Sequence, residues 1–280
     1  SMRPKQWTKN VFVLAALIFD RKLFLSEYFI PTLAGFVIFC LISSAVYLIN
    51  DLVDIEKDRQ HPVKRNRPLA SGQFPKSAAV AAAIVLITVC VPASMALGMD
   101  FAVISIGYLV MMVAYSFVLK NLVIIDVMTI AAGFVLRVAA GVVLVDVERF
   151  SPWLYICMTL LALFLGFSKR RHEIALLEGD ALNHRAILDQ YSLGLLDEMI
   201  NVVASSTVIA YSLYTFFAPN VPANHTMMLT IPFVLYGLFR YLYLVHIKQE
   251  GGSPEELLLK DRPFLLCVVL FGVAVLAVMY

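Results

Sequence analysis

Three carboxylates with helical spacing stand at the end of the second long apolar stretch of this chain. Asp51, Asp54 and Asp58 follow one another at intervals of three and four residues, and Asn50 directly precedes them. On a helix this spacing places the three carboxylates on one face, with Asn50 at its edge. Carboxylates packed together repel one another unless a cation is present, and hard oxygen ligands suit Mg²⁺. The cluster therefore predicts a Mg²⁺–diphosphate site with the three aspartates as metal ligands. The competing interpretation is a solvated helix end with ordinary loop charges.

Two groups of basic residues could bind the phosphates of such a substrate. Lys64 and Arg67 follow the acidic cluster, and both Arg forks and Lys point charges bind phosphate oxygens. Further along, Lys169, Arg170 and Arg171 are consecutive, and a row of cations ligates anions rather than Mg²⁺. The sequence thus predicts one metal-binding wall and one phosphate-binding wall, which fits a donor with a further phosphate besides its diphosphate. The alternative for the second group is anchoring at lipid headgroups.

Two more charges, Asp126 and Arg137, lie inside the fifth apolar segment. A charge at mid-bilayer costs about 2.5–3.5 kcal/mol on insertion scales, so it usually faces a cavity or a partner. The two residues are 11 positions apart, which is roughly 16 Å along a helix, so they cannot pair with each other. We expect Asp126 near the cytoplasmic end, where it could join the metal or orient substrate hydroxyls. Arg137 lies deeper and is either a catalytic group or a buried, hydrogen-bonded arginine.

The elements that must position these residues are membrane-spanning helices. The chain has 280 residues, of which 61% are hydrophobic, and soluble domains have about 45–50%. Apolar stretches of about 20 residues can each span a hydrocarbon core. Four cysteines stand singly in apolar segments, so no spacing predicts a metal site or a disulfide framework. The nine apolar segments run approximately over Asn10–Phe24, Tyr28–Asn50, Ser77–Leu97, Phe101–Leu119, Leu122–Val145, Pro152–Phe167, Leu195–Phe217, Met227–Ile247 and Pro263–Tyr280.

The fold class predicted is therefore an all-α integral membrane protein with nine transmembrane helices. Lys and Arg concentrate at the amino terminus and in alternate connections, above all residues 51–76 and 168–194. The positive-inside rule places all of these on the cytoplasmic side. The net charge of +2 gives no reason to expect nucleic acid. We expect a multi-pass protein of the plasma (inner) membrane, with its amino terminus and active-site loops in the cytoplasm.

The acidic motif carries a family resemblance. The run NDLVDIEKD at 50–58, followed by a basic stretch and RPLASG at 67–72, resembles the first acidic motif of the UbiA-type intramembrane prenyltransferases. The resemblance implies one transmembrane domain over residues 1–280. Its helices would surround a central cavity open sideways to lipid, with cytoplasmic cap loops at about 51–76 and 168–194. Typical members carry a second Asp-rich motif in the later loop, where this chain reads SKRRHE.

That departure resembles the decaprenyl-phosphate phosphoribosyltransferase branch of the superfamily. Four further stretches are similar to this branch: RPKQWTKN at 3–10, YSFVLK at 115–120, DVMTIAAGFVLRVAAG at 126–141 and SKRRHE at 168–173. The resemblance implies that Tyr115 and Lys120 bind substrate, as the similar Tyr–Lys pair of other members does, although the spacing here is one residue longer. For Lys5 and Lys9 it suggests contact with the phosphate of a lipid acceptor, and anchoring at the interface is the alternative.

The predicted activity is transfer of 5-phosphoribose from phosphoribosyl pyrophosphate to a polyprenyl phosphate, with Mg²⁺ as cofactor, for cell-wall arabinan precursor synthesis. Asn50, Asp51, Asp54, Asp58 and Asp126 would be catalytic. One alternative is a prenyltransferase that uses a prenyl diphosphate and an aromatic acceptor. A transporter is a remote alternative. It predicts polar residues along a path through the membrane, whereas here the charges gather on one face and only Asp126 and Arg137 lie deeper.

Overall fold

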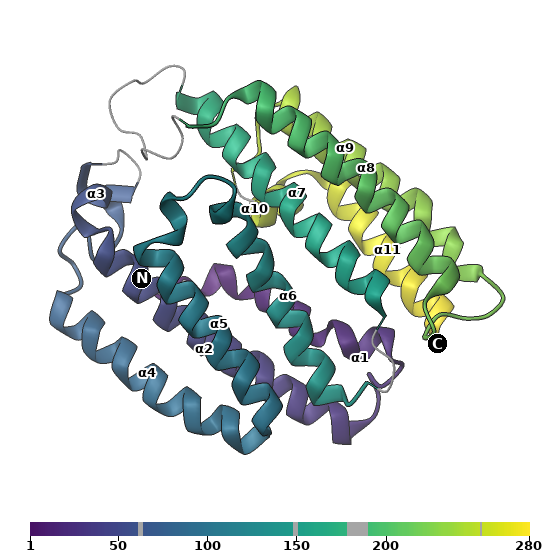
Figure 1. The fold of residues 1–280 in the computed structure, drawn as a ribbon, viewed down its shortest axis with the longest axis horizontal. Coiled ribbons are helices and arrows are strands. Elements are labelled where there is room, and N and C mark those ends of the chain that lie inside the picture. The colour runs from purple at the N-terminus through teal and green to yellow at the C-terminus, as the bar shows by residue number, and fades with distance from the viewer. Residues whose placement is uncertain (61–63, 148–150, 178–189, 253) are drawn as a thin grey trace. The chain divides into compact units, whose positions relative to one another are not determined.

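The computed structural model describes residues 1–60, 64–147, 151–177, 190–252 and 254–280, apart from the side chains of Lys5, Leu176, Leu177 and Glu255. Every regular element in these ranges is helical, which confirms the predicted all-α class (Figure 1). The elements are η1 (Pro4–Leu14), α1 (Ala15–Phe19), α2 (Ser26–Val53), α3 (Ile55–Gln60), η2 (Lys64–Asn66), α4 (Lys76–Leu97), α5 (Met99–Phe117), η3 (Leu119–Asn121), α6 (Ile125–Val145), α7 (Pro152–Leu177), α8 (Leu193–Phe217), η5 (Thr226–Thr230), α9 (Ile231–His246), α10 (Pro254–Lys260) and α11 (Arg262–Met279).

Eight of the described helical segments are long and apolar enough to cross a membrane. They correspond to the second through ninth predicted segments. The first predicted segment forms η1 and α1, whose apolar part, Gln6–Phe19, is shorter than the others. Large apolar side chains such as Ile84, Val85 and Leu266 are more than half exposed, as lipid-facing residues are. The protein is therefore an integral membrane protein, and the count of nine spans stays a prediction.

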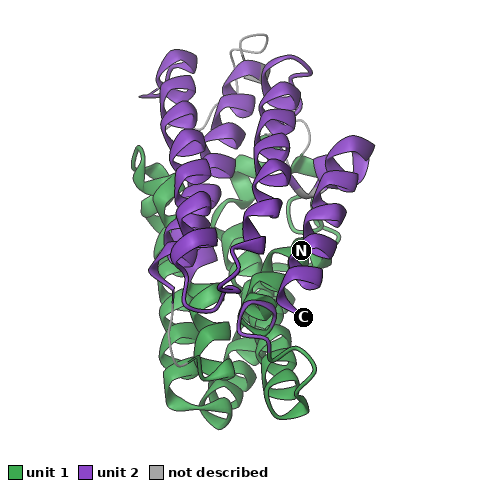
Figure 2. Ribbon diagram, turned by 90° about the vertical axis from the view of Figure 1, so that its right-hand side faces the viewer, with its two compact units in different colours: residues 1–17, 22–129, 136–147 green, residues 18–21, 130–135, 148–280 purple. Residues whose placement is uncertain are grey.

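By its internal contacts the chain divides into two compact units (Figure 2). Unit 1 comprises residues 1–17, 22–129 and 136–147, and unit 2 comprises residues 18–21, 130–135 and 148–280. The acidic cluster belongs to unit 1, and Lys169, Arg170 and Arg171 belong to unit 2. The single domain over residues 1–280 stays a prediction.

Unit 1 has a core in which the amino-terminal segment packs among the long helices. Val13 of η1, Phe39 of α2, and Phe101 and Tyr108 of α5 are buried together. At Gly141 of α6, an added Cβ would lie 2.0 Å from the carbonyl oxygen of Val13. Only glycine permits this approach of two backbones. The 3₁₀ segment η1 is 11 residues long, whereas runs beyond three or four residues are uncommon.

The end of α2 differs from the uninterrupted helix expected for the acidic cluster. Helix α2 ends at Val53, α3 begins at Ile55, and Asp54 between them has φ −95° and ψ 8°. The backbone N–H of Asp54 still donates to Asn50 O (3.0 Å), and that of Asp58 to Asp54 O (2.8 Å). Because both bonds keep the helical i to i−4 pattern, the break bends the chain without separating the three aspartates.

Unit 2 is built on α7, α8, α9 and α11, with Tyr211, Tyr214 and Met227 in its core. Helix α7 continues ten residues past its predicted end at Phe167, so Lys169, Arg170 and Arg171 are helical rather than in a loop. Lys, Arg and Glu favour helix, which explains the extension. The rest of the predicted cap at 168–194 lies largely outside the described residues.

Candidate functional site

Each aspartate of the acidic cluster has a cationic partner from a different part of unit 1. Asp51, Asp54 and Asp58 are all at least nine-tenths buried. Their partners are Arg3 of the amino terminus, Arg67 after η2, and Lys120 of η3. The expected repulsion among the carboxylates is thus offset by three cations of the protein itself, and the six formal charges balance.

Asp51 pairs with two arginines. Its Oδ1 accepts from a guanidinium nitrogen of Arg3 and lies 3.4 Å from Nη1 of Arg67. Its Oδ2 is buried and has no hydrogen-bond partner among the described residues. A buried carboxylate oxygen without a partner is costly, and it needs a ligand that supplies positive charge or a proton.

The other two aspartates form short ion pairs. Nζ of Lys120 donates to Oδ1 of Asp54 at 2.6 Å, and both side chains are almost fully buried. Nη1 of Arg67 donates to Oδ2 of Asp58 at 2.6 Å. Arg67 therefore joins Asp51 to Asp58, and Lys120 brings the turn after α5 to the end of α2.

The donor set suits a hard divalent cation that is completed by its substrate. Within the described ranges, no three His, Cys, Asp or Glu side chains come close enough to form a metal site on their own. Mg²⁺ is normally held by one or two carboxylates together with substrate phosphates and water. Asp51, whose Oδ2 has no partner in the described part of the chain, and Asp54 fit this role, and Arg67 and Lys120 lie beside them.

Asp126 is fully buried in the first turn of α6, a position where the helix dipole stabilises a carboxylate. The turn that delivers it is strained. Ile124 has φ 68° and ψ −45°, and the N–H of Ile125 donates to Val123 O at 2.7 Å. This is a γ-turn with a β-branched residue at its centre, a rare and unfavourable arrangement. Such strain concentrates at functional sites, and here the turn lies between Lys120 and Asp126.

Arg137 is a buried, hydrogen-bonded arginine. Its Nε donates to Oδ1 of Asn10 and its Nη2 to the hydroxyl of Tyr108, both at 2.7 Å. The hydroxyl of Ser43 also donates to Asn10 Oδ1, at 3.3 Å. The network ties η1 to α2, α5 and α6. This geometry favours the interpretation of Arg137 as a buried arginine that holds these helices together. Its contact with substrate stays a prediction.

In unit 2, two of the three consecutive cations, Arg170 and Arg171, have different partners. Arg170 is buried and donates to Oε2 of Glu173 at 2.5 Å. Arg171 donates through Nε to Oδ1 of Asp197 at 2.5 Å, and that oxygen also lies 3.1 Å from Nε2 of His246. Arg171 thus links α7 to α8 and α9. Lys169 is half-buried, and phosphate binding by the three cations stays a prediction.

The remaining predicted residues lie in unit 1. Asn50 is half-buried in the last turn of α2, Lys64 in η2 and Tyr115 near the end of α5. Lys9 is half-buried in η1, whereas the side chain of Lys5 lies outside the described part. Their roles stay predictions.

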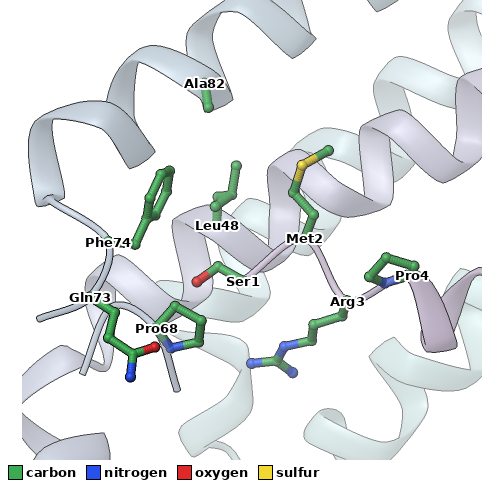
Figure 3. Close-up of a pocket in the computed structure, with 9 residues that line it drawn as sticks. All are labelled: Ser1, Met2, Arg3, Pro4, Leu48, Pro68, Gln73, Phe74 and Ala82. Carbon is green, nitrogen blue, oxygen red and sulfur yellow. The ribbon is translucent and has the colours of Figure 1, made fainter. Parts of the chain in front are cut away.

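Sequence reasoning did not select Arg3 as a site residue, nor Asp197 and His246 as partners of Arg171. Arg3 and Asp51 are 48 residues apart, so no local pattern could have paired them. Arg3 also borders an apolar pocket of about 470 Å³, lined by Met2, Leu48, Pro68, Phe74 and Ala82 among others. In Figure 3 its guanidinium lies on the side of Pro68, away from Ala82.

Comparisons with known proteins identify the family of this chain. A decaprenyl-phosphate phosphoribosyltransferase of Mycolicibacterium smegmatis is 33% identical over 280 residues, covering 94% of this chain and 86% of that protein. One of Corynebacterium glutamicum is 32% identical over 267 residues, covering 94% and 80%. A solved structure of a UbiA homolog from Archaeoglobus fulgidus, bound to GPP and Mg²⁺, superposes on this chain with a TM-score of 0.76. The match is 18% identical in sequence and covers 99% of this chain and 97% of that one, so it shows that the two share a fold. A family model described as the UbiA prenyltransferase family matches residues 11–259. The chain belongs to the UbiA prenyltransferase family.

Proposed function

We propose that this protein transfers 5-phosphoribose from phosphoribosyl pyrophosphate to a decaprenyl-like polyprenyl phosphate and releases diphosphate. The observation that carries the proposal is the identity of 32–33% to decaprenyl-phosphate phosphoribosyltransferases over 94% of the chain. Cell-wall arabinan precursor synthesis would be the use of the product.

The acidic cluster supports a diphosphate leaving group. Bound Mg²⁺ would neutralise the charge that develops on the departing diphosphate. Asp51 and Asp54 would hold the ion, with Asp58 beside them through Arg67. Asn50 and Asp126 would orient metal ligands or ribose hydroxyls, and the transition state would resemble an oxocarbenium ion.

The cations of unit 1 support the same reaction. Arg67 and Lys120 already carry buried or half-buried positive charge at the carboxylates. Preorganised charge of this kind stabilises a leaving anion without reorganisation at the moment of reaction. Lys64 and Tyr115 would complete the diphosphate contacts. Lys169, Arg170 and Arg171 are proposed to bind the donor's phosphates, most of all its 5-phosphate.

The acceptor requires no general base, because a phosphate monoester is already anionic at neutral pH. Catalysis would then rest on positioning and electrostatics. Attack opposite the leaving group predicts inversion at the anomeric carbon. Lys5 and Lys9 would hold the acceptor phosphate, and Arg137 would support them by fixing Asn10 of the same segment.

We further propose that the protein lies in the plasma membrane with its site on the cytoplasmic side. The soluble donor is made and available there, and the Lys/Arg bias of the connections favours this orientation. The lipid tail would remain in the bilayer.

The test is a membrane assay with labelled phosphoribosyl pyrophosphate and decaprenyl phosphate. We expect a labelled lipid that depends on Mg²⁺, and we expect Asp54→Ala to abolish its formation. The second candidate is a prenyltransferase, because the family description names that activity. Such an enzyme would instead transfer label from a prenyl diphosphate to an acceptor. Metal-independent or absent labelling by the ribose donor in membranes that contain the folded protein would overturn the proposal.

A further inference from the structure

We propose that Arg3 is a further donor-binding residue. It neutralises Asp51 in the donor-free protein and turns to the diphosphate when metal and donor bind together. This inference rests on the proposed function, because it assigns a residue to the diphosphate site.

The backbone around Arg3 is held in an unusual conformation. Arg3, the N-cap residue directly before η1, has φ 50° and ψ 63°, in the left-handed region that non-glycine residues rarely adopt. The hydroxyl of Ser44 shares its hydrogen between Cys40 O at 2.8 Å and Met2 O at 3.2 Å, and the indole N–H of Trp7 donates to that hydroxyl at 3.0 Å. The amino-terminal segment is therefore fastened to α2 on both sides of Arg3.

The side chain of Arg3 is placed between a buried carboxylate and solvent. Its guanidinium lies 4.8 Å from the ring centre of Tyr47, a stacking arrangement that stabilises the cation. It pairs with Asp51, whose side chain is 1% exposed, but it is itself 27% exposed. A cation that is open to solvent on one side can exchange a carboxylate for a phosphate with little rearrangement.

The charges of the site couple the metal to the diphosphate. Arg3, Arg67 and Lys120 pair with the three aspartates, so a divalent cation that arrives alone must compete with cations already in place. The described carboxylates also lack a complete metal site of their own. A diphosphate supplies oxygen ligands for the metal and anionic oxygens for the cations. Each ligand therefore favours the other, as linkage requires, and Arg3 is one of the groups that changes partner.

The experiment measures binding rather than turnover. Mn²⁺, as a paramagnetic substitute for Mg²⁺, is titrated by electron paramagnetic resonance into the full chain in nanodiscs, with and without inorganic pyrophosphate. Complex formation in solution is common to all variants, so only ratios between proteins are read. Arg3→Gln should bind Mn²⁺ alone about tenfold more tightly than the wild type, an effect between those of exposed and buried charge pairs. In the presence of pyrophosphate it should bind about tenfold more weakly.

Opposite changes in the two affinities separate donor binding from a purely structural role, which would weaken both together. Arg3→Lys keeps the charge and should restore most of both affinities. If Arg3→Gln does not fold, Arg3→Lys still tests whether a cation at this position sets the two affinities. The matched control is Arg59→Gln, which removes an exposed charge pair with Glu56 at 3.0 Å and a hydrogen bond to Ala70 O, and it should bind both ligands as the wild type does. Wild-type affinities in Arg3→Gln, or a loss of both, would overturn the inference alone. If the wild type binds neither Mn²⁺ nor its pyrophosphate complex, the proposed diphosphate site fails as well.

Discussion

The ion pair between Lys120 and Asp54 should be the costliest charged contact of unit 1 to break. Its 2.6 Å bond joins side chains that are 6% and 10% exposed. Replacing one partner of such a pair leaves an uncompensated buried charge, which costs about 3–5 kcal/mol. Lys120→Met should therefore lower the free energy of unfolding by roughly this amount, because Asp54 loses its cation.

The matched control is Lys76→Met. Lys76 lies 3.8 Å from Glu56, and both side chains are mostly exposed, so this pair contributes about 0–1 kcal/mol. The double variant Lys120→Met with Asp54→Leu should recover most of the loss, because replacing a buried pair by apolar residues is often close to neutral. This recovery distinguishes the charge imbalance from lost packing.

The assay is equilibrium unfolding by SDS in mixed micelles, followed with a thiol-reactive fluorophore. The protein offers a direct signal because Cys40, Cys90, Cys157 and Cys267 are all free and buried, so labelling reports exposure of the interior. The reasoning would be refuted if Lys120→Met and Lys76→Met lost the same stability, or if the double variant were no better than the single one.

Three other predictions concern separate parts of the protein. Lys169→Ala should raise the KM for phosphoribosyl pyrophosphate more than that for the lipid, and steady-state kinetics showing the reverse would remove its donor-binding role. Ile124→Gly should raise the free energy of unfolding by up to about 1–3 kcal/mol, because glycine adopts the γ-turn without strain; an unchanged or lower value would contradict this. The hydrogen bond from Arg240 holds the pKa of Asp261 below its usual range. A lowered pKa adds stability at neutral pH that is lost as the pH falls through it. Tryptophan fluorescence should therefore find Asp261→Asn less stable than wild type at neutral pH, with the gap closing in strong acid.

Much of the fold followed from composition and periodicity. The long apolar segments became eight long helices, whereas the first segment was predicted to run to Phe24 and its helix ends earlier, at Phe19. The extension of α7 to Leu177 was missed because charge was taken as a mark of a loop. The residues there are good helix formers, and Arg170 pairs with Glu173 three positions along.

The candidate site was predicted only in part. The spacing of the aspartates showed that they would lie together and need positive charge. It could not show which cations supply it, because Arg3 and Lys120 are 48 and 66 residues from their partners. The acceptor of Arg137, Asn10, is 127 residues away in sequence. Such pairings are set by how helices pack, and no local pattern encodes them.

The central claim is that the lipid is the acceptor and the sugar phosphate is the group transferred. Mass spectrometry of the lipid fraction tests it most directly, after purified protein has been incubated with decaprenyl phosphate, phosphoribosyl pyrophosphate and Mg²⁺. The account predicts a polyprenyl phosphate heavier by one phosphoribosyl group, absent with Asp54→Ala. A lipid of unchanged mass in the presence of folded, metal-binding protein would contradict it.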